Sequence, residues 1–406
     1  MNHYKTHYVK LSDLGKIVTG KTPPTNDESF YDGDYPFITP TDIKTFDIKY
    51  IANTDRSLSK KGALYQKRCI LPEKSICFVC IGSTIGKMCM TDQLSFSNQQ
   101  INTIIPNDRV DPEYLFYLLK YIRTYFQSIG GGTGSGKSII NKTVFSNSRV
   151  EFISDTNIQK RIARLLSQYD SMIDTNNKRI KLLEQMAENL YKEWFVRFRF
   201  PGYKKAEFES GIPKGWDIVR MNNFCYVTDG THDTPAPTID GVPLVTGKSL
   251  KEGFVDFSET YNISIKDHKQ IKKRSGLKDG DILFSNIGTV GSTCVVDYDR
   301  EFSVKNVIIF KLDSIEKTVY LYLWLNSKPM QDIFSMQTNG SSQQFVGLTF
   351  MRKYKVMAPQ QNVLEKFCSL VNPIFEERKI LHRENEYLMK QRDLLLPRLM
   401  SGKLEV

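Results

Sequence analysis

The sequence predicts an α+β protein with an internal repeat. In it, two mostly β domains alternate with two long helices that pack as an antiparallel coiled coil. Two observations support this fold class. The second half of the 406-residue chain restates the first at an offset of roughly 205 to 210 residues. Each half also ends in a long stretch with large apolar residues at heptad spacing. We therefore expect a first domain over residues 1–155, a first helix over 156–200, a second domain over 201–360, and a second helix with a C-terminal tail over 361–406, related by a pseudo-two-fold axis.

The composition is that of a globular protein with substantial cores, because apolar residues make up 40% of the chain and charged residues 25%. The formal net charge of +11 indicates an acidic partner, and nucleic acid is the usual one. No apolar run approaches the roughly 18 residues of a membrane span, and the first ten residues hold no signal segment, so we expect a cytoplasmic protein. The seven cysteines are expected to be reduced. Cys77 and Cys80 would point to opposite faces of a strand, where they cannot share a metal.

The repeated segments have the pattern of strands and turns, with short apolar or alternating runs broken by Gly, Pro, Asn and Asp. Each half therefore begins as a mostly β domain of about 150 residues. The matching pairs are "LSDLGKIVTGKTPPT" with "MNNFCYVTDGTHDTPAPT", "FITPTDI" with "LVTGKSL", "ICFVCIGSTIGK" with "ILFSNIGTVGS", and "FSNQQINTIIP" with "FSVKNVIIFKL".

Each half then turns helical, over residues 111–129 and 319–336, before a polar loop, a short strand and the long helix. The two heptad seams are most simply explained if the helices pack against each other; the alternative is that each covers only its own sheet. Asn176 on the seam lowers stability but can fix the register, and Pro373 predicts a late start or a kink in the second helix. The seam residues are Ile162, Leu166, Tyr169, Ile173, Asn176, Ile180, Leu183 and Leu190, then Phe367, Val371, Ile374, Leu381, Leu388 and Leu395.

The stretch "GGGTGSGKS" matches the phosphate-binding loop pattern G-x-x-x-x-G-K-[ST] from Gly131 to Ser138. A true phosphate loop joins a strand to a helix, whereas here a helical pattern precedes the loop and a β-branched stretch follows it. The matching loop of the second half, "TNGSSQQFVGLT", has no Gly-Lys-Ser. We therefore expect its backbone amides and Lys137 to contact a DNA phosphate.

Other catalytic patterns are weak. None of the five histidines forms a metal-spaced pair with another His or a Cys, so we predict no metal site. No glycine-rich turn with a downstream acidic residue indicates a dinucleotide or methyl-donor site. His232, in "DGTHDTP", either has a structural role or contacts a base.

In their order, these motifs resemble those of a specificity (S) subunit of a Type I restriction-modification system, over almost the whole chain. The motifs are "TGKTPPT" and "DGTHDTP", "IGSTIGK" and "NIGTVGS", "FSNQQ", "GGTGSGKS" and "NGSSQQ", the first long helix, and the tail "LLLPRLMSGKLEV". The resemblance implies two target recognition domains that read the halves of a split DNA target, separated by the two helices. It also implies a non-catalytic subunit that docks two methyltransferase (M) subunits and restriction (R) subunits. S-adenosylmethionine, ATP and Mg would then belong to those partners.

Cations in the matching loops are expected to hold the DNA backbone and amides to contact base edges, although each could also be an ordinary polar surface residue. Because the loops of the two halves differ, we expect an asymmetric target. The candidate DNA-binding residues are Lys21, Thr22, Thr41, Lys44, Ser83, Thr84, Lys87, Asn98, Gln99, Gln100, Thr133, Ser135, Lys137, Thr231, His232, Thr234, Lys248, Asn286, Thr289, Lys305, Asn306, Ser341, Ser342, Gln343 and Gln344.

Three alternatives remain open from the sequence: a P-loop ATPase acting on nucleic acid, a sequence-independent DNA scaffold, and a specificity subunit of another restriction architecture. Met186, Phe195 and Met400 are expected as exposed apolar residues on the helices, where partner subunits would cover them.

Overall fold

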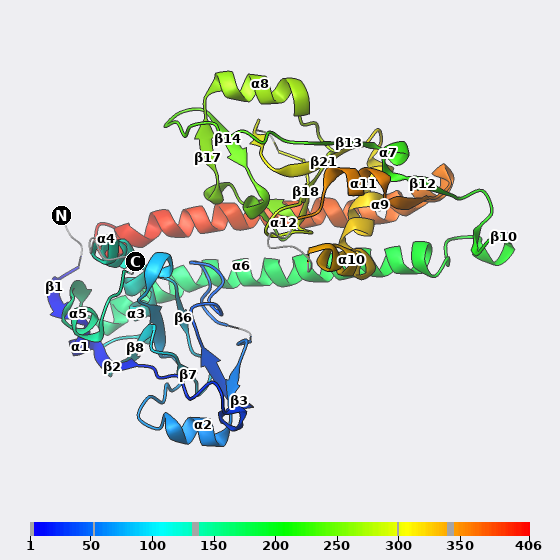
Figure 1. Ribbon diagram of the computed structural model, residues 1–406. Coiled ribbons are helices and arrows are strands. Elements are labelled where there is room, and N and C mark those ends of the chain that lie inside the picture. The colour runs from blue at the N-terminus through cyan, green and yellow to red at the C-terminus, as the bar shows by residue number, and fades with distance from the viewer. Residues whose placement is uncertain (1–3, 52, 132–137, 299, 339–344) are drawn as a thin grey trace. The chain divides into compact units, whose positions relative to one another are not determined.

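The computed structural model describes residues 4–51, 53–131, 138–298, 300–338 and 345–406 (Figure 1). The chain divides into two compact units. Unit 1 comprises residues 1–177 and 382–406, and unit 2 comprises residues 178–381. Both boundaries fall inside the two long helices, so each unit holds one β domain and a stretch of each helix.

Unit 1 contains a four-stranded antiparallel sheet of order β2-β8-β5-β6 and a three-stranded sheet of order β4-β3-β7, in which β3 and β7 run parallel. A third pair, β1 and β9, brings the start of the domain to its end. The strands are β1 (Thr6–Lys10), β2 (Gly15–Thr19), β3 (Tyr31–Ile38), β4 (Ser57–Leu58), β5 (Ile76–Val79), β6 (Met88–Met90), β7 (Phe96–Ser97), β8 (Ile101–Pro106) and β9 (Arg149–Ile153).

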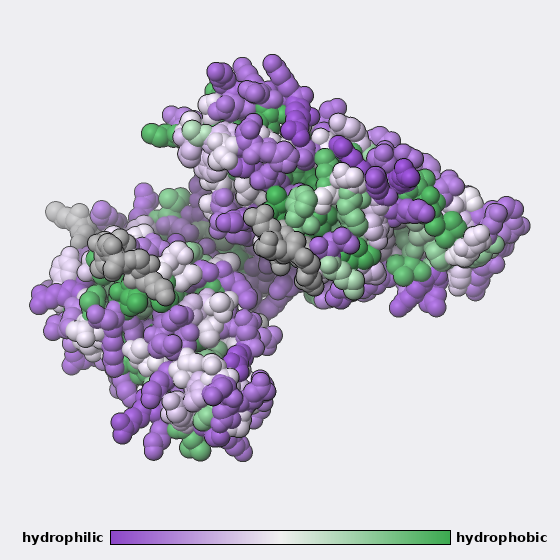
Figure 2. Space-filling model, viewed as in Figure 1, coloured by the Kyte–Doolittle hydropathy of each residue, from purple (hydrophilic) through white to green (hydrophobic). Residues whose placement is uncertain are grey.

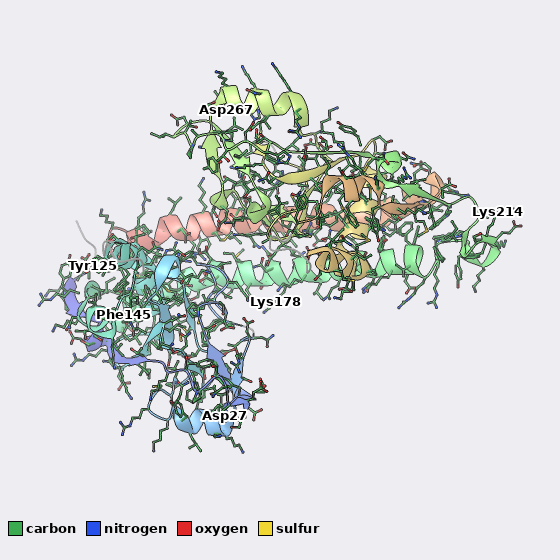
Figure 3. The ribbon with its side chains drawn as sticks, in the orientation of Figure 1. Asp27, Tyr125, Phe145, Lys178, Lys214 and Asp267 are labelled. Atoms are coloured by element: carbon green, nitrogen blue, oxygen red, sulfur yellow. The ribbon has the colours of Figure 1, made fainter. Side chains whose placement is uncertain are left out.

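Four short helices of unit 1, α1, α3, α4 and α5, pack on one face of its larger sheet, whereas α2 packs against β3 and β4 of the smaller sheet. In α3, Pro112 occupies the first turn and the Asp111 carboxylate accepts a hydrogen bond from the backbone N–H of Tyr114 at 3.0 Å, a standard helix start. Phe145, labelled in Figure 3, lies 5.3 Å from Phe78 between ring centroids. The short helices are α1 (Leu11–Leu14), α2 (Lys60–Tyr65), α3 (Pro112–Tyr121), α4 (Arg123–Gly131) and α5 (Lys142–Asn147).

Strand β5 is buried on both faces and separates two apolar clusters. Cys77 lies in one cluster and Cys80 in the other, as the alternation of side chains along a strand predicts. All seven cysteines are free thiols. The prediction that the C-x-x-C pair belongs to the core is confirmed.

Unit 2 repeats this plan with sheets of order β13-β21-β18-β19 and β17-β14-β20. The pseudo-repeat predicted from the sequence is therefore confirmed at the level of strand order and direction. The strands are β10 (Phe208–Glu209), β11 (Ile212–Pro213), β12 (Asp217–Arg220), β13 (Tyr226–Asp229), β14 (Val242–Val245), β15 (Leu250–Lys251), β16 (Phe254–Val255), β17 (Tyr261–Ile263), β18 (Ile282–Ser285), β19 (Thr293–Val295), β20 (Ser303–Val304), β21 (Val307–Lys311) and β22 (Lys355–Ala358). The short helices are α7 (Met221–Phe224), α8 (Ile265–Ser275), α9 (Ile315–Asn326), α10 (Lys328–Thr338) and α11 (Leu348–Lys353).

The two long helices are α6 (Thr156–Tyr191), which continues as a π-helical turn over Lys192–Val196, and α12 (Gln361–Met400). In unit 1, Asp170 contacts Arg392 and Asn176 contacts Asn385, so residue numbers rise along one helix as they fall along the other. In unit 2, the Glu184–Arg378 and Trp194–Phe367 contacts run in the same sense. The helices are therefore antiparallel within each unit, and the alternative in which each covers only its own sheet is wrong.

The seam positions face inward in the structure, although the second helix begins earlier than Pro373 suggested. Helix α12 starts at Gln361 and runs through Pro373, which is exposed. Ser369, whose carbonyl loses its helical partner at this proline, is also exposed, so the helix tolerates the proline. The buried seam residues are Ile162, Leu166, Asn176, Ile180, Phe367, Val371, Ile374, Leu381 and Leu388, and the half-buried ones are Tyr169, Ile173, Leu183, Leu190 and Leu395.

The buried pair Asn176 and Asn385 offers a test of this seam. The Asn176 amide donates to Asn385 Oδ1 at 3.1 Å and to Glu384 at 3.0 Å, and the Asn385 amide donates to Asn177 at 2.8 Å. Asn385→Leu alone should lower the free energy of unfolding by about 1–3 kcal/mol, because it removes one of the two acceptors of the buried Asn176 amide. The double change to leucine should recover most of that loss, since both polar groups are then gone. Denaturant unfolding of the two single variants and the double variant measures the difference, with the exposed change Asn189→Leu as control.

Candidate nucleic-acid interface

In unit 1, the loop after β2 lies directly against the loop after β7. A Cβ atom at Gly20 would lie 2.0 Å from the carbonyl oxygen of Ser97, so only glycine fits there. The backbone N–H of Lys21 donates to the same oxygen at 3.1 Å, and Thr22 Oγ1 donates to Gln99 Oε1 at 2.6 Å. The contacts bring three of the predicted residues together, and the Lys21 ammonium lies 5.2 Å from the centre of the Tyr65 ring.

The three polar residues after β7 have different roles. Asn98 is buried, and its side chain bonds both the backbone N–H of Gln100 at 3.0 Å and the Gln100 side chain at 3.3 Å. Gln99 between them is exposed. Asn98 therefore shapes the loop, while Gln99 has the accessible amide.

Two further loops of unit 1 carry the remaining predicted residues. Lys87 Nζ donates to the carbonyl oxygen of Lys44 at 2.9 Å, which ties one loop to the other. Thr41, Lys44 and Ser83 are exposed, and Thr84 Oγ1 caps its own turn by donating to Ile81 O at 2.8 Å.

The end of the glycine-rich loop returns to this turn, since Gly82 N donates to Ser138 O at 2.8 Å. We call residues 20–22, 39–44, 82–87 and 97–100 the loop set of unit 1. The predicted residues Thr133, Ser135 and Lys137 lie outside the described residues.

Unit 2 has the same close approach at the equivalent place. A Cβ atom at Gly230 would lie 2.2 Å from Val304 O, and the backbone N–H of Thr231 donates to that oxygen at 3.0 Å. Beside this contact, Lys305 Nζ donates to Thr234 Oγ1. We call residues 230–234, 246–248, 286–289 and 304–306 the loop set of unit 2.

His232 is held on both ring nitrogens. Nδ1 lies 2.9 Å from Asn306 Oδ1, and Nε2 lies 2.9 Å from an Asp229 oxygen whose carboxylate also pairs with Arg274. The histidine thus orients the Asn306 amide and is itself exposed. Sequence reasoning missed the pairing of Asp229 with Arg274, because the two residues are far apart in the chain and no local motif joins them.

The other predicted residues of unit 2 differ in their exposure to solvent. Lys248 and Thr289 are exposed, and Thr289 Oγ1 donates to Gly247 O at 3.1 Å. Asn286 is buried, and its amide oxygen has no hydrogen-bond partner in the part of the chain that the structure describes. A base contact by Asn286 would require its side chain to move. Ser341, Ser342, Gln343 and Gln344 lie outside the described residues.

The backbone contacts show which residues of the two loop sets correspond. Ser97 and Val304 each accept the N–H that follows the glycine, and the next residues, Asn98 and Lys305, each donate to the neighbouring strand at 3.1 and 2.9 Å. Gln99 thus corresponds to Asn306. The sequence pairing of "FSNQQ" with "FSVKN" was therefore wrong by one residue, because the loop of unit 2 is one residue shorter.

Chemically, each loop set presents cations, amides and hydroxyls, groups that are able to donate hydrogen bonds to anionic oxygens and to base edges. Hydrophilic residues also gather over α8 of unit 2 in Figure 2. Among the described residues, no cluster of three or more His, Cys, Asp or Glu side chains could hold a metal ion. None of the described helices is long and apolar enough to cross a membrane.

Comparison with known proteins gives one consistent result. A family model described as "Type I restriction modification DNA specificity domain" matches residues 5–185 and 213–381. The type I restriction enzyme MjaIX specificity subunit of Methanocaldococcus jannaschii is 27% identical over 427 residues, covering 98% of this chain and 93% of that protein. The MjaVIII specificity subunit of the same organism is 24% identical over 413 residues, covering 98% and 92%. The crystal structure of a type I S subunit from M. genitalium shares the fold, with a TM-score of 0.56 and 15% identity over 98% of this chain and 97% of that one.

Proposed function

The chain belongs to the type I restriction-modification DNA specificity family, and from this premise we propose that it reads a bipartite, asymmetric DNA target. One half of the target would be read by the loop set of unit 1 and the other by that of unit 2. The observation that carries this proposal is that the two sets share their backbone contacts but differ in their side chains. Lys21 and Gln99 in unit 1 stand where Thr231 and Asn306 stand in unit 2.

The proposal assigns two kinds of contact. Exposed cations such as Lys21, Lys44 and Lys248 would hold phosphates, which sets position without reading sequence. Gln99 and Asn306 would bond base edges, since an amide can bond adenine at two atoms in the major groove. Their orientation is already restrained, by Thr22 in one case and by His232 in the other.

We further propose that the long helices dock two methyltransferase subunits and that restriction subunits join them. Both helices expose large apolar side chains that a partner would cover. The expectation for Phe195 and Met400 was wrong, because both are buried in the core of their units, whereas Met186 is exposed. The exposed set is Met172, Leu182 and Met186 on α6 and Leu370, Ile380, Tyr387 and Leu394 on α12. S-adenosylmethionine, ATP and Mg would be bound by the partners, and this chain would supply no catalytic group.

The phosphate role predicts a specific salt dependence. Lys248→Ala should weaken binding to every duplex by a similar factor and reduce the slope of log K against log salt concentration by about 0.9, the value expected for one released counterion. Gln99→Ala should instead weaken binding to the cognate duplex alone. Titrations of the complex with methyltransferase subunits on cognate and unrelated duplexes at several salt concentrations measure both effects. Lys204→Ala, an exposed lysine outside both loop sets, is the control. Equal binding of the wild-type complex to all duplexes would support a sequence-independent scaffold instead.

The rival P-loop function has its own test. ATP hydrolysis by the isolated chain, abolished by Lys137→Ala, would support an ATPase and contradict our proposal. We expect no turnover by the isolated chain.

A further inference from the structure

Each unit contains a buried arginine of α12 that joins three segments of the chain. In unit 1 this residue is Arg392, which is 1% exposed. Its guanidinium contacts Asp170 of α6 at 2.6 Å and Asp47 of the β domain at 2.7 Å, both through charge-assisted hydrogen bonds. The adjacent Asp393 accepts a further bond at 2.9 Å. Arg392 therefore ties the β domain of unit 1 to both helices at once.

Lys120 adds a second cation to this cluster. Lys120 of α3, which is also buried, donates to Asp47 at 2.8 Å. Burial alone would raise the pKa of Asp47, but the Lys120 and Arg392 cations outweigh that effect and hold the pKa at about 2. Asp47 is thus ionised at any physiological pH.

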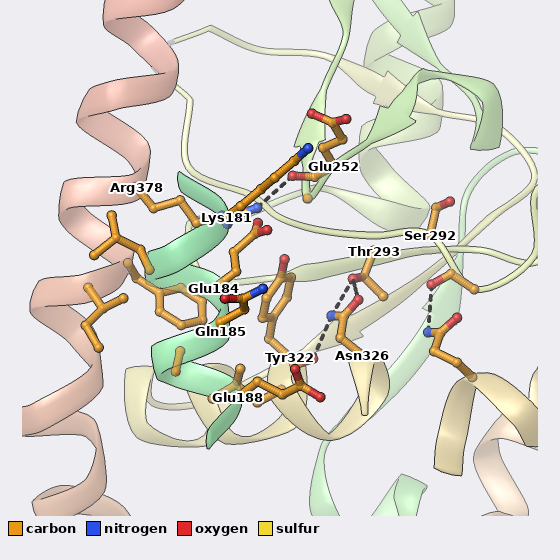
Figure 4. Close-up of a pocket in the computed structure, with 18 of the residues that line it drawn as sticks. Lys181, Glu184, Gln185, Glu188, Glu252, Ser292, Thr293, Tyr322, Asn326 and Arg378 are labelled. Atoms are coloured by element: carbon orange, nitrogen blue, oxygen red, sulfur yellow. Dashed lines mark hydrogen bonds and ion pairs between the residues drawn. The ribbon is translucent and has the colours of Figure 1, made fainter. Parts of the chain in front are cut away.

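In unit 2 the corresponding residue is Arg378, which is 6% exposed (Figure 4). Its Nε donates to Glu184 of α6 at 2.7 Å, and Nη2 donates to the carbonyl oxygen of Glu252 at 2.7 Å. The guanidinium lies 4.2 Å from the centre of the Phe254 ring. The backbone at Gly253 packs directly against the Arg378 guanidinium, since a Cβ atom at this glycine would lie 2.0 Å from Nη2. A pocket of about 530 Å³ lined in part by Arg378, Glu184 and Tyr322 opens beside this contact.

The two arginines are not copies made by the repeat. The repeat relates α6 to α12, and Arg378 and Arg392 both lie on α12, two heptads apart and hence on one side of that helix. They nevertheless contact the same part of each β domain: Asp47 lies between β3 and β4, and Glu252 lies in the β15–β16 turn, between the corresponding strands β14 and β17. Each unit therefore joins its β domain to the helix pair through a buried arginine, but the contacting residues differ between the units.

Stability alone explains this arrangement poorly, because a buried ion pair is often no more stable than apolar residues of similar volume. An arginine makes the contact directional, because its planar guanidinium donates hydrogen bonds in a fixed geometry. Two surfaces joined only by apolar contacts can slide past each other. We propose that Arg378 and Arg392 are positioning residues that fix the orientation of each β domain on its own stretch of the helix pair. They thereby restrict the length of the unread gap in the DNA target. This inference rests on the proposed function.

DNA geometry gives the displacement that a β domain must follow when the gap changes length. A gap longer or shorter by one base pair displaces a half-site by about 3.4 Å along the duplex. A β domain held by several directional bonds resists that displacement, while one held by apolar contacts alone can follow it.

The test removes the contact on the side of the β domain and leaves the helix pair intact. Asp47→Ala retains the bonds of Arg392 to Asp170 and Asp393. Gly253→Ala displaces Arg378 from the Glu252 carbonyl, because the added Cβ would lie 2.0 Å from Nη2. Each variant is co-expressed with the methyltransferase subunit in cells that lack other adenine methylation, and methylated adenines are mapped genome-wide. We expect both half-site sequences to stay unchanged, while sites with a gap one base pair longer or shorter become methylated at least tenfold more often than with the wild type. Asp34→Ala, an exposed carboxylate of the same domain, is the control.

The outcomes are distinct. A wild-type gap in both variants, altered half-site bases, or a uniform loss of methylation at all sites would overturn the positioning role. Absence of any split motif with the wild type would instead contradict the proposed function itself.

Discussion

Gly230→Val is expected to abolish reading of one half of the target while the other half is still read. The valine Cβ would lie 2.2 Å from the carbonyl oxygen of Val304, a separation that backbone atoms cannot accept, so the loop must move. That movement breaks the 3.0 Å bond from Thr231 N to Val304 O and displaces His232, which orients Asn306. Loss of the bidentate base contact of Asn306, at about 1–3 kcal/mol, should lower the rate of methylation at the cognate site by about 5- to 150-fold.

Gly20→Val is the matched change in unit 1, where the Cβ would lie 2.0 Å from Ser97 O. It should lower the sequence specificity for the other half of the motif. Lys204→Val, at an exposed position outside both loop sets, is the control. Methylation of oligonucleotides mutated in one half-site or the other measures the effect. If both glycine variants relaxed the same half of the motif, the assignment of one half to each unit would be wrong.

Arg392→Leu is expected to lower the free energy of unfolding by about 3–5 kcal/mol, the usual effect of removing one partner from a buried ion pair. The change leaves the Asp170 and Asp47 carboxylates near Lys120 without the guanidinium that bonds them both. Arg164→Leu, on the exposed side of α6, should cost less than about 1 kcal/mol. Denaturant unfolding of the purified chain measures both.

A multiple variant distinguishes loss of the arginine itself from the cost of leaving its partner carboxylates buried and unpaired. Replacing Arg392, Asp170, Asp47 and Lys120 together with leucine should recover most of the lost stability, because none of the four charges is then left buried and unpaired. If Arg392→Leu alone cost less than about 1 kcal/mol, the cluster would not be coupled as its bonds indicate.

Local pattern was enough to predict the repeat, the helix pair and the core cysteines. Strand alternation placed Cys77 and Cys80 in different clusters, and heptad spacing placed Ile162 and Leu388 in the seam. These features depend only on neighbouring residues in the chain, so a single sequence contains them.

Features that depend on tertiary contacts were not predictable in the same way. The one-residue shift that pairs Gln99 with Asn306 is set by loop length and by the bonds to Ser97 and Val304. Helix α12 continues through Pro373 because that residue is exposed. The roles of Arg378 and Arg392 were not predicted, since their partners on the β domains are far away in the sequence.

The central claim is that one chain reads two different half-sites, one with each unit. Co-expression of the wild-type chain with its methyltransferase subunit, followed by genome-wide mapping of methylated adenines, tests it most directly. We predict a single split motif with two unlike half-sites and a fixed gap. Gln99→Ala should lower the sequence specificity at the half-site read by unit 1. Asn306→Ala should lower the specificity at the half-site read by unit 2. A continuous motif, a palindromic motif, or methylation without any motif would contradict the account.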